Sequence, residues 1–169
     1  MGLMLELQPS LGPVLVVGGG KVALRKARAA AEAGFAVTVV APHIASEFEA
    51  LGVRCIERPV EERDLDDAAI VFACTNDREV NRQVGAWARA RRLPVVVADS
   101  PEESTAFSPA IHRDGDLVVG VATNGASPRL AQHVRDRIAA AIGTGWASRV
   151  ERARRERQRG TGRVEEEAE

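Results

Sequence analysis

The sequence predicts an α/β fold with a mostly parallel sheet. Strand and helix patterns alternate from Pro13 to Pro94, and this alternation is typical of βαβ units, in which helices join parallel strands. A glycine-rich turn, Gly18-Gly19-Gly20, separates the first apolar strand from the first helix. Ala and Val supply most of the 45% of hydrophobic residues, and aromatic residues make up 4%, which suits close packing of helices on a sheet.

Five strands and three helices are expected in the first hundred residues. Residues 14–17 form an uninterrupted apolar run, which predicts a strand buried on both faces. The pattern then becomes helical up to Gly34, which suits the end of a helix. Thr75-Asn76-Asp77 provides a loop and an N-cap for a later helix. The predicted strands are 14–17, 35–40, 53–57, 69–74 and 94–98, and the predicted helices are 21–33, 44–51 and 78–91.

A second region begins near residue 100, where the alternation stops and residues 100–104 are expected to form a loop. Strands over 107–112 and 117–122 are expected to pair across Asp114-Gly115, a dipeptide suited to a tight turn. Ser127-Pro128 offers an N-cap followed by proline at the first helical position, which predicts a helix to about Ile142. A shorter helix is expected over 146–157, followed by a disordered charged stretch over 160–169. We therefore divide the chain into residues 1–100, 101–142 and 143–169.

Charge and composition exclude several classes of function. A formal net charge of -1 gives no overall attraction to nucleic acid or to an anionic membrane surface. Cys55 and Cys74 lie far apart, with no cluster of histidines around them, so we expect two buried strand thiols and no metal site. No segment approaches the roughly 20 apolar residues of a membrane span, and residues 1–8 lack the pattern of a secretion signal. We therefore expect a cytoplasmic protein.

The glycine-rich turn predicts a dinucleotide-binding domain of the Rossmann type. Gly18, Gly20 and Ala23 form the pattern G-x-G-x-x-A between a predicted strand and a predicted helix, which is the context that makes this motif informative. Gly18 permits the tight turn, Gly20 lets a pyrophosphate approach the backbone, and Ala23 lets the helix lie close to the sheet. The amides from Gly20 through Lys21 to Val22 would then face the phosphates. The alternative is a glycine-rich turn without a ligand.

The second predicted strand ends without the acidic residue that commonly binds the adenosine ribose. It continues into Pro42-His43, and no arginine stands there to receive the 2′-phosphate of NADP. The residues themselves therefore determine the choice between NAD and NADP only weakly.

Three further groups of residues are candidates for a site. Asp99 follows the fifth strand at the edge where open α/β sheets place catalytic groups, although it can equally begin the turn before Pro101. Thr75 and Asn81 can hydrogen-bond a nicotinamide ribose, although helix capping explains Thr75 nearly as well. Residues 123–128 form a second polar loop before a helix, which is another potential anion site.

Taken together, these motifs resemble the precorrin-2 dehydrogenase family, the dehydrogenase and ferrochelatase module of siroheme synthases. The resemblance extends from about Leu3 to Ile142. The glycine turn is generic, but its combination with Gly-Ala-Ser-Pro in one short chain is more specific. The matching segments are VLVVGGGKVALRKA (14–27), VTVVAP (37–42), CTNDREVN (74–81), VVVADSP (95–101), SPAI (108–111) and NGASPRLA (124–131).

The resemblance implies NAD-dependent oxidation of precorrin-2 to sirohydrochlorin by a homodimer. It implies proton removal by Asp99, which in bifunctional members also serves metal insertion, and a substrate cleft between the Rossmann domain and the later part. The adenosine side of NAD would be held by Lys21-Val22 and Pro42-His43. A substrate with many carboxylates requires cations and anion sites. Our candidates for this role are Arg113, Thr123, Ser127, Arg129 and Arg135.

Two other readings remain. A non-enzymatic nucleotide-sensing Rossmann module would need the glycine turn but not Asp99 or Gly-Ala-Ser-Pro. An ordinary dehydrogenase for a small alcohol or hydroxy acid would normally show a Tyr-Lys or histidine-based acid, and the chain contains no tyrosine. The chain also departs from the family at Val96 and Ala122, and it ends soon after Arg157 where many members carry a longer helical region. We therefore favour the dehydrogenase over the chelatase.

Overall fold

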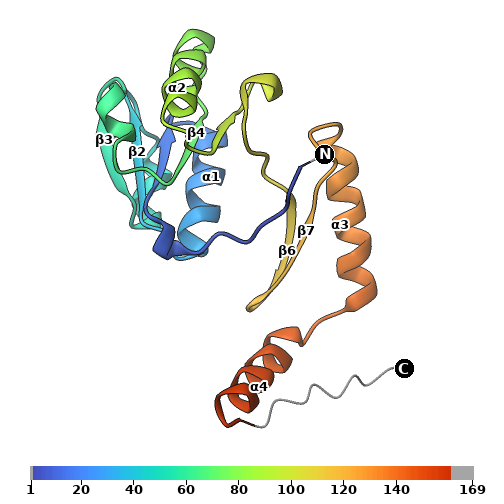
Figure 1. The fold of residues 1–169 in the computed structure, drawn as a ribbon. Helices are drawn as coiled ribbons and strands as arrows, with labels where there is room; N and C mark the ends of the chain where they lie inside the picture. The colour runs from blue at the N-terminus through green and yellow to red at the C-terminus, as the bar shows by residue number, and fades with distance from the viewer. Residues whose placement is uncertain (1, 161–169) are drawn as a thin grey trace. The chain divides into compact units, whose positions relative to one another are not determined.

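A computed structural model describes residues 2–160, which form two compact units, one ending at Phe107 and one beginning at Ser108 (Figure 1). Each unit is described by itself. The stretch predicted to be disordered, 160–169, lies outside the described residues except for Gly160. Within residues 2–160, no helix combines the length and the apolar character that a membrane crossing requires.

The first unit contains one sheet of five parallel strands in the order β3-β2-β1-β4-β5. Two helices and two short 3-10 helices connect the strands, and one further 3-10 helix precedes β1 while another follows β5. The strands are β1 (Val14–Val17), β2 (Val37–Ala41), β3 (Arg54–Glu57), β4 (Ile70–Ala73) and β5 (Val95–Val97). The helices are α1 (Lys21–Glu32) and α2 (Arg78–Ala90), and the 3-10 helices are η1 (Pro9–Leu11), η2 (Ser46–Leu51), η3 (Glu62–Leu65) and η4 (Pro101–Glu103). This arrangement confirms the predicted Rossmann-type α/β fold.

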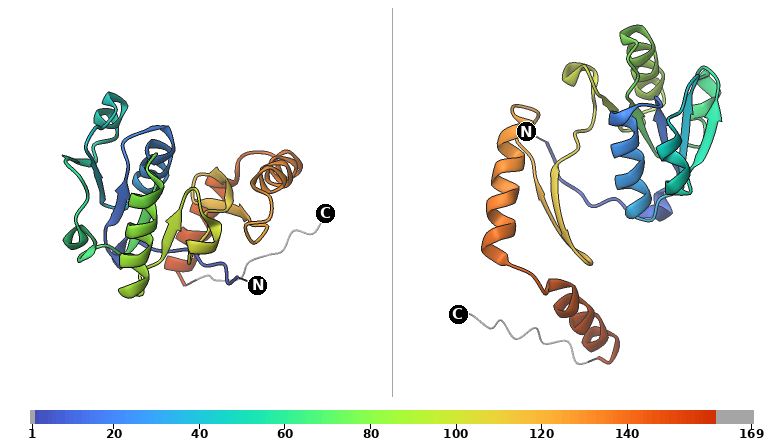
Figure 2. Two further views of the ribbon diagram at one scale, coloured as in Figure 1. Left: turned by 90° about the horizontal axis from the view of Figure 1, so that it is seen from above. Right: turned by 180° about the vertical axis from the view of Figure 1, so that it is seen from behind.

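The central strand β1 is buried on both faces, as its apolar run predicts. Val14 and Val16 pack with Ala23 and Ala27 of α1, whereas Leu15 and Val17 pack with Val84 and Ala88 of α2. The two helices therefore cover opposite faces of the sheet (Figure 2). The small alanine side chains are fully buried and let each helix lie close to the strands. Burial of each valine of β1 stabilises the fold by about 1.5 to 3 kcal/mol.

Two local predictions need correction. The segment predicted as a helix over 44–51 is the 3-10 helix η2, which Phe48 anchors in the core and Gly52 ends in a left-handed conformation. Cys55 is exposed rather than buried, because β3 is an edge strand paired only with β2. Cys74 is buried at the end of β4, as predicted. Burial of a strand thiol thus depends on the position of its strand in the sheet.

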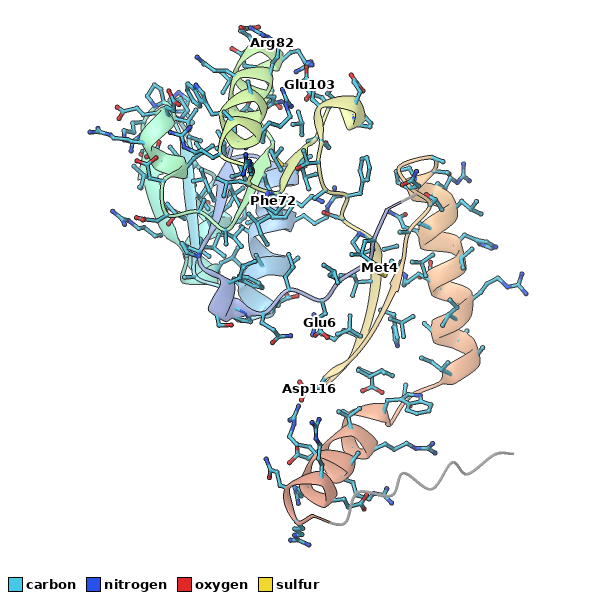
Figure 3. The ribbon with its side chains drawn as sticks, in the orientation of Figure 1. Met4, Glu6, Phe72, Arg82, Glu103 and Asp116 are labelled. Carbon is cyan, nitrogen blue, oxygen red and sulfur yellow. The ribbon has the colours of Figure 1, made fainter. Side chains whose placement is uncertain are left out.

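The second unit is a hairpin followed by two helices. Strand β6 (Ala110–Asp114) pairs antiparallel with β7 (Leu117–Val121), and Gly115 adopts a positive φ of 60° in the turn between them. Helix α3 (Pro128–Ile142) begins at the predicted cap, where the Ser127 hydroxyl accepts a hydrogen bond from the amide of Leu130 at 3.2 Å. Helix α4 (Trp146–Gln158) follows, and Asp116 at the tip of the hairpin pairs with Arg154 of α4 (Figure 3).

The Arg58–Asp64 pair makes the stability of the first unit depend on pH. Arg58 donates two hydrogen bonds to the Asp64 carboxylate, at 2.6 and 2.8 Å, and the amide of Glu61 donates a third at 2.8 Å. These bonds, chiefly those from Arg58, lower the pKa of Asp64 below its ordinary value. The stabilisation is therefore complete above the ordinary pKa of the unfolded chain and is lost as the pH falls through the lower folded-state pKa.

We expect Asp64→Asn to lower the free energy of unfolding at pH 7 by about 1 to 3 kcal/mol, the usual value of hydrogen bonds to a charged group. The difference in the free energy of unfolding between the variant and the wild-type chain should shrink towards acid pH. The reason is that protonated Asp64 is uncharged, like Asn, and no longer offers Arg58 a carboxylate. Urea titrations at pH 7 and at pH 3 measure both effects. An equal difference at the two pH values would contradict the prediction.

Candidate nucleotide-binding site

A pocket of about 490 Å³ lies at the carboxyl ends of β1, β2 and β4. The strand order turns back at β1, and the helices that follow β1 and β4 leave the sheet on opposite faces, so the loops there diverge and leave a crevice. A second hollow of the same volume lies at the other end of α1, against η2, away from these strand ends. The first pocket is lined by Gly18, Gly19, Gly20, Ala41, Pro42, His43, Ile44, Ala45, Cys74, Thr75 and Asn76.

The glycine turn fits between two other loops because it has no side chains. Gly18 has a φ of 128°, and a Cβ atom there would lie 2.5 Å from the carbonyl oxygen of Cys74. A Cβ atom on Gly19 would lie 2.0 Å from the carbonyl oxygen of His43. The sequence motif pointed to Gly18 and Gly20 and missed Gly19, although an unbroken run of three glycines was the available signal. Gly19 joins the turn to the loop after β2.

Gly20 and the start of α1 form an open anion site. A Cβ atom on Gly20 would meet no protein atom within 4 Å, so the missing side chain leaves free space. Gly20 is the N-cap of α1, no side chain caps the helix, and its first turn carries no acidic residue. The amides that begin α1, including those of Lys21 and Val22, are therefore available to a ligand. A dinucleotide pyrophosphate fits this cradle, and Ala23 is fully buried where the helix meets the sheet.

Pro42 and His43 form an exposed rim on the β2 side of the pocket. This loop is tied to the glycine turn, because the amide of Ala45 donates to the carbonyl of Gly19 at 3.1 Å. No Asp, Glu, Lys or Arg side chain is among the residues that line the pocket. The side chains of Lys21 and Val22 are exposed and lie outside the lining, so any contact from them to a nucleotide comes through their amides.

Thr75 lines the pocket, and its polar groups are hydrogen-bonded to Asn81, which does not line it. Asn81 is fully buried, and its amide oxygen accepts hydrogen bonds from the Thr75 amide at 2.9 Å and the Thr75 hydroxyl at 2.8 Å. Its amide nitrogen donates to the Thr75 carbonyl at 3.0 Å. Both polar ends of Asn81 are occupied, so we expect Asn81 to hold the loop after β4 in place rather than touch a ribose. Asn76, expected from the sequence only as part of a loop and helix cap, is an exposed polar residue that lines the pocket.

This arrangement predicts different effects for substitutions of two asparagines: a loss of stability at Asn81 and a loss of cofactor binding at Asn76. Asn81→Leu should lower the free energy of unfolding by about 2 to 6 kcal/mol, because it leaves the half-buried amide and carbonyl of Thr75 unpaired at about 1 to 3 kcal/mol each. Asn76→Ala should change stability by less than about 0.5 kcal/mol, as is usual at exposed positions, and should weaken cofactor binding. Urea unfolding and cofactor titration of both variants provide the measurement. Equal losses of stability would contradict the assignment.

Cys74 is a buried thiol at the floor of the pocket. Burial raises its pKa to about 11, with a further rise from Asp99 and opposing effects from Lys26 and Arg25. The group is therefore protonated at neutral pH and is a poor nucleophile. Cys74 contributes shape to the site and no covalent chemistry.

Asp99 is exposed, two residues beyond the end of β5, at the same edge of the sheet as the pocket. The preceding residue continues the pairing with β4, since the amide of Ala98 donates to the carbonyl of Ala73 at 2.9 Å. Within residues 2–160, the Asp99 carboxylate makes no hydrogen bond, and the turn that follows begins at Ser100, the N-cap of η4. Asp99 therefore does not use its side chain to begin this turn, and its carboxylate is available for a catalytic role.

The candidate substrate residues all belong to the second unit. Arg113 on β6 and Arg129 on α3 are exposed. The Thr123 hydroxyl donates to the carbonyl of Ser127 at 3.1 Å, and the Ser127 hydroxyl caps α3, so both hydroxyls stabilise the loop before this helix. Arg135 donates to the carbonyl of Ile111 at 3.0 Å and therefore anchors α3 to β6. A contact of these residues with the substrate stays a prediction.

The described residues hold no group of three or more His, Cys, Asp or Glu side chains that could bind a metal. His43 and His133 are exposed, as expected of surface histidines, whereas His112 is half-buried. The Nε2 atom of His112 is enclosed and has no hydrogen-bond partner within the described part of the chain.

The fold and the site define a protein of the Rossmann class that binds a nicotinamide dinucleotide. A family model described as "Putative NAD(P)-binding" matches residues 4–110, and a second model, "Sirohaem biosynthesis protein central", matches residues 114–141. The solved structure of SirC, a precorrin-2 dehydrogenase, superposes with a TM-score of 0.70 at 30% identity, covering 89% of this chain and 75% of SirC. The chain belongs to the precorrin-2 dehydrogenase family.

Longer proteins share this module. The siroheme synthase of Pseudomonas entomophila (strain L48) is 44% identical over 135 residues, which cover 78% of this chain and 29% of that protein. The siroheme synthase of Methylobacillus flagellatus is 42% identical over 130 residues, covering 75% of this chain and 28% of its own length. The chain thus spans less than a third of these curated relatives.

Proposed function

We propose that this chain oxidises precorrin-2 to sirohydrochlorin in siroheme biosynthesis, with NAD as the hydride acceptor. The observation that carries the proposal is that both units match a precorrin-2 dehydrogenase, while the first unit combines an open dinucleotide cradle with an unpaired carboxylate at one sheet edge. A sensor module needs the cradle alone. The match over both units and the presence of Asp99 favour an enzyme over a sensor module.

The proposed reaction removes a hydride and a proton from precorrin-2. NAD, held through its pyrophosphate by the glycine turn and the first turn of α1, would supply the nicotinamide ring that takes the hydride. Asp99 accepts the proton as general base, for which a carboxylate needs reach to the substrate and an ionised state. Gly18, Gly19 and Gly20 let the pyrophosphate approach the backbone, and the first turn of α1 donates hydrogen bonds to it. Arg113 and Arg129 would pair with substrate carboxylates.

We propose NAD rather than NADP because no lysine or arginine side chain lines the pocket. A 2′-phosphate commonly pairs with such a cation. Titration of the protein with each dinucleotide tests this preference, and tighter binding of NADP would contradict it.

An anaerobic assay with purified protein, precorrin-2 and NAD tests the proposed activity. We expect NADH to form together with the absorption spectrum of sirohydrochlorin. A parallel titration measures NAD binding without substrate. Binding of NAD without oxidation of precorrin-2 would instead support a nucleotide-sensing module. Addition of ferrous or cobaltous ions to the sirohydrochlorin product tests the metal insertion known from bifunctional family members.

We further propose that the protein is a homodimer in the cytoplasm. Large apolar side chains are exposed at Leu3, Leu5 and Leu7, and also at Ile111 and Leu130 of the second unit, which is typical of surfaces that a partner covers. An exposed free thiol at Cys55 suits a reducing compartment. Light scattering after size exclusion should give twice the 18.1 kDa of one chain. A monomer at all concentrations would contradict the dimer.

A further inference from the structure

The segment that follows Asp99 turns back along the outer edge of β5. The hydroxyl of Ser104 accepts a hydrogen bond from the amide of Val97 at 2.9 Å and can donate to the carbonyl of Ser100 at 3.1 Å. Val97 is the last residue of β5, and Ser100 is the N-cap of η4. The Ser104 side chain thus forms hydrogen bonds to one residue before Asp99 and to one residue after it.

The backbone on either side of Asp99 is held by hydrogen bonds. The amide of Ala98 donates to Ala73 of β4 at 2.9 Å, and the amide of Ser100 donates to the carbonyl of Val97 at 3.3 Å. Ser100 itself is 1% exposed. Ser104 closes this arrangement, because it bonds to both Val97 and Ser100. The Asp99 carboxylate therefore projects from a short span whose two ends are fixed.

Helix α2 fixes the same turn from the other side. Arg78 pairs with the Glu103 carboxylate at 2.7 Å, and Arg89 donates to the Glu103 carbonyl at 2.6 Å. Figure 3 shows Glu103 on the loop after β5, next to the helix that carries Arg82. Glu103 immediately precedes Ser104, so these bonds place the serine against the strand.

We propose that Ser104 is a positioning residue that holds Asp99 where it can accept the substrate proton. The proposal rests on the proposed dehydrogenase activity. A general base works only within hydrogen-bond reach of the proton it removes, and a misplacement of about 1 Å can cost on the order of 100-fold in rate. Ser104 makes no hydrogen bond to a residue that lines the nucleotide pocket, so the cofactor should bind equally well without it.

Thr105 provides a matched control. Its hydroxyl accepts a hydrogen bond from the amide of Val95 at 2.9 Å, which is the same kind of bond to the same strand, but two residues further from Asp99. Ser104→Ala and Thr105→Val each remove one hydroxyl partner of a β5 amide. Both variants should therefore lower the melting temperature by similar amounts, and only the first should affect catalysis.

The test measures kcat, KM for precorrin-2 and Kd for NAD in Ser104→Ala, Thr105→Val and the hydroxyl-retaining Ser104→Thr. We expect kcat to fall at least about tenfold in Ser104→Ala, to stay within about twofold of wild type in Thr105→Val, and to recover substantially in Ser104→Thr. The Kd for NAD should be unchanged in all three. Equal effects on kcat of Ser104→Ala and Thr105→Val, including no effect of either, would overturn the proposal.

Amide hydrogen exchange gives a readout independent of turnover. Exchange at the hydrogen-bonded amides of Ala98 and Ser100 should accelerate in Ser104→Ala and stay at the wild-type rate in Thr105→Val. Unchanged exchange in Ser104→Ala would show that the serine does not hold this span and would overturn the proposal. Failure of the wild-type chain to oxidise precorrin-2 would overturn the proposed function and the catalytic role of Ser104 with it, whereas altered kinetics of the variants alone concern only the serine.

Discussion

Asp99→Asn should reduce kcat for precorrin-2 oxidation by about 100- to 10,000-fold, the range that general-base catalysis contributes. Asparagine has nearly the same shape as aspartate but cannot accept the substrate proton. Asp99 is exposed, and its carboxylate makes no hydrogen bond within residues 2–160, so the replacement should leave the fold intact. The loss corresponds to about 3 to 5 kcal/mol of transition-state stabilisation.

Steady-state kinetics and NAD titration separate this effect from a general disturbance of the site. Glu102→Gln is the matched control, because it removes a negative charge three residues further along the chain while glutamine can still accept the hydrogen bond from the Ser100 hydroxyl. We expect Glu102→Gln to retain most of the activity, and Asp99→Asn to retain NAD affinity and melting temperature. A loss of activity below about tenfold in Asp99→Asn would assign proton removal to another group.

The glycine turn supplies the second large effect. Gly19→Ala should lower the free energy of unfolding by at least about 1 to 3 kcal/mol, the usual cost of forcing extra volume into a packed place. The reason is that the new methyl group would lie 2.0 Å from the carbonyl oxygen of His43. The loop after β2 must then move, and the pocket that it lines should lose cofactor affinity as well.

Gly20→Ala separates cofactor binding from folding. Its methyl group would meet no protein atom within 4 Å, and the φ of -99° is accessible to alanine. Stability should therefore change by no more than about 1 kcal/mol, because alanine restricts the unfolded chain but is a poorer N-cap than glycine, while NAD binding weakens at least about tenfold because the methyl group occupies the space left for the pyrophosphate. Calorimetric melting and NAD titration of the two variants test the pair. Retained NAD affinity in Gly20→Ala would place the pyrophosphate elsewhere.

The elements whose signals are local were predictable from the sequence. The uninterrupted apolar run 14–17 specifies a strand buried on both faces, and the caps at Asp77 and Ser127 specify where α2 and α3 begin. The glycine turn between strand and helix specified the place of the nucleotide pocket. Each of these signals lies within a few residues of the feature that it determines.

Features that depend on pairing across the fold were not predictable in the same way. The exposure of Cys55 follows from the edge position of β3, which no residue near Cys55 specifies. The hydrogen bonds between the Asn81 amide and Thr75, six residues earlier, were also not expected from the sequence, whereas a contact of Asn81 with a ribose stays a prediction. The contact of Gly19 with His43 likewise joins two loops that are distant in sequence.

The hydroxyls of Ser104 and Thr105 also determine at which edge this sheet can pair with a further strand. They occupy the outward amides of Val97 and Val95, so β5 offers these donors to no further strand. The opposite edge, β3, has no such cover in the described chain, and it carries charged residues at both ends together with the exposed Cys55. Charged side chains discourage strand addition at an open edge. Strand addition at β3 is therefore discouraged, and association of partly oxidised protein at this edge should instead occur through a disulfide between the exposed Cys55 residues of two molecules.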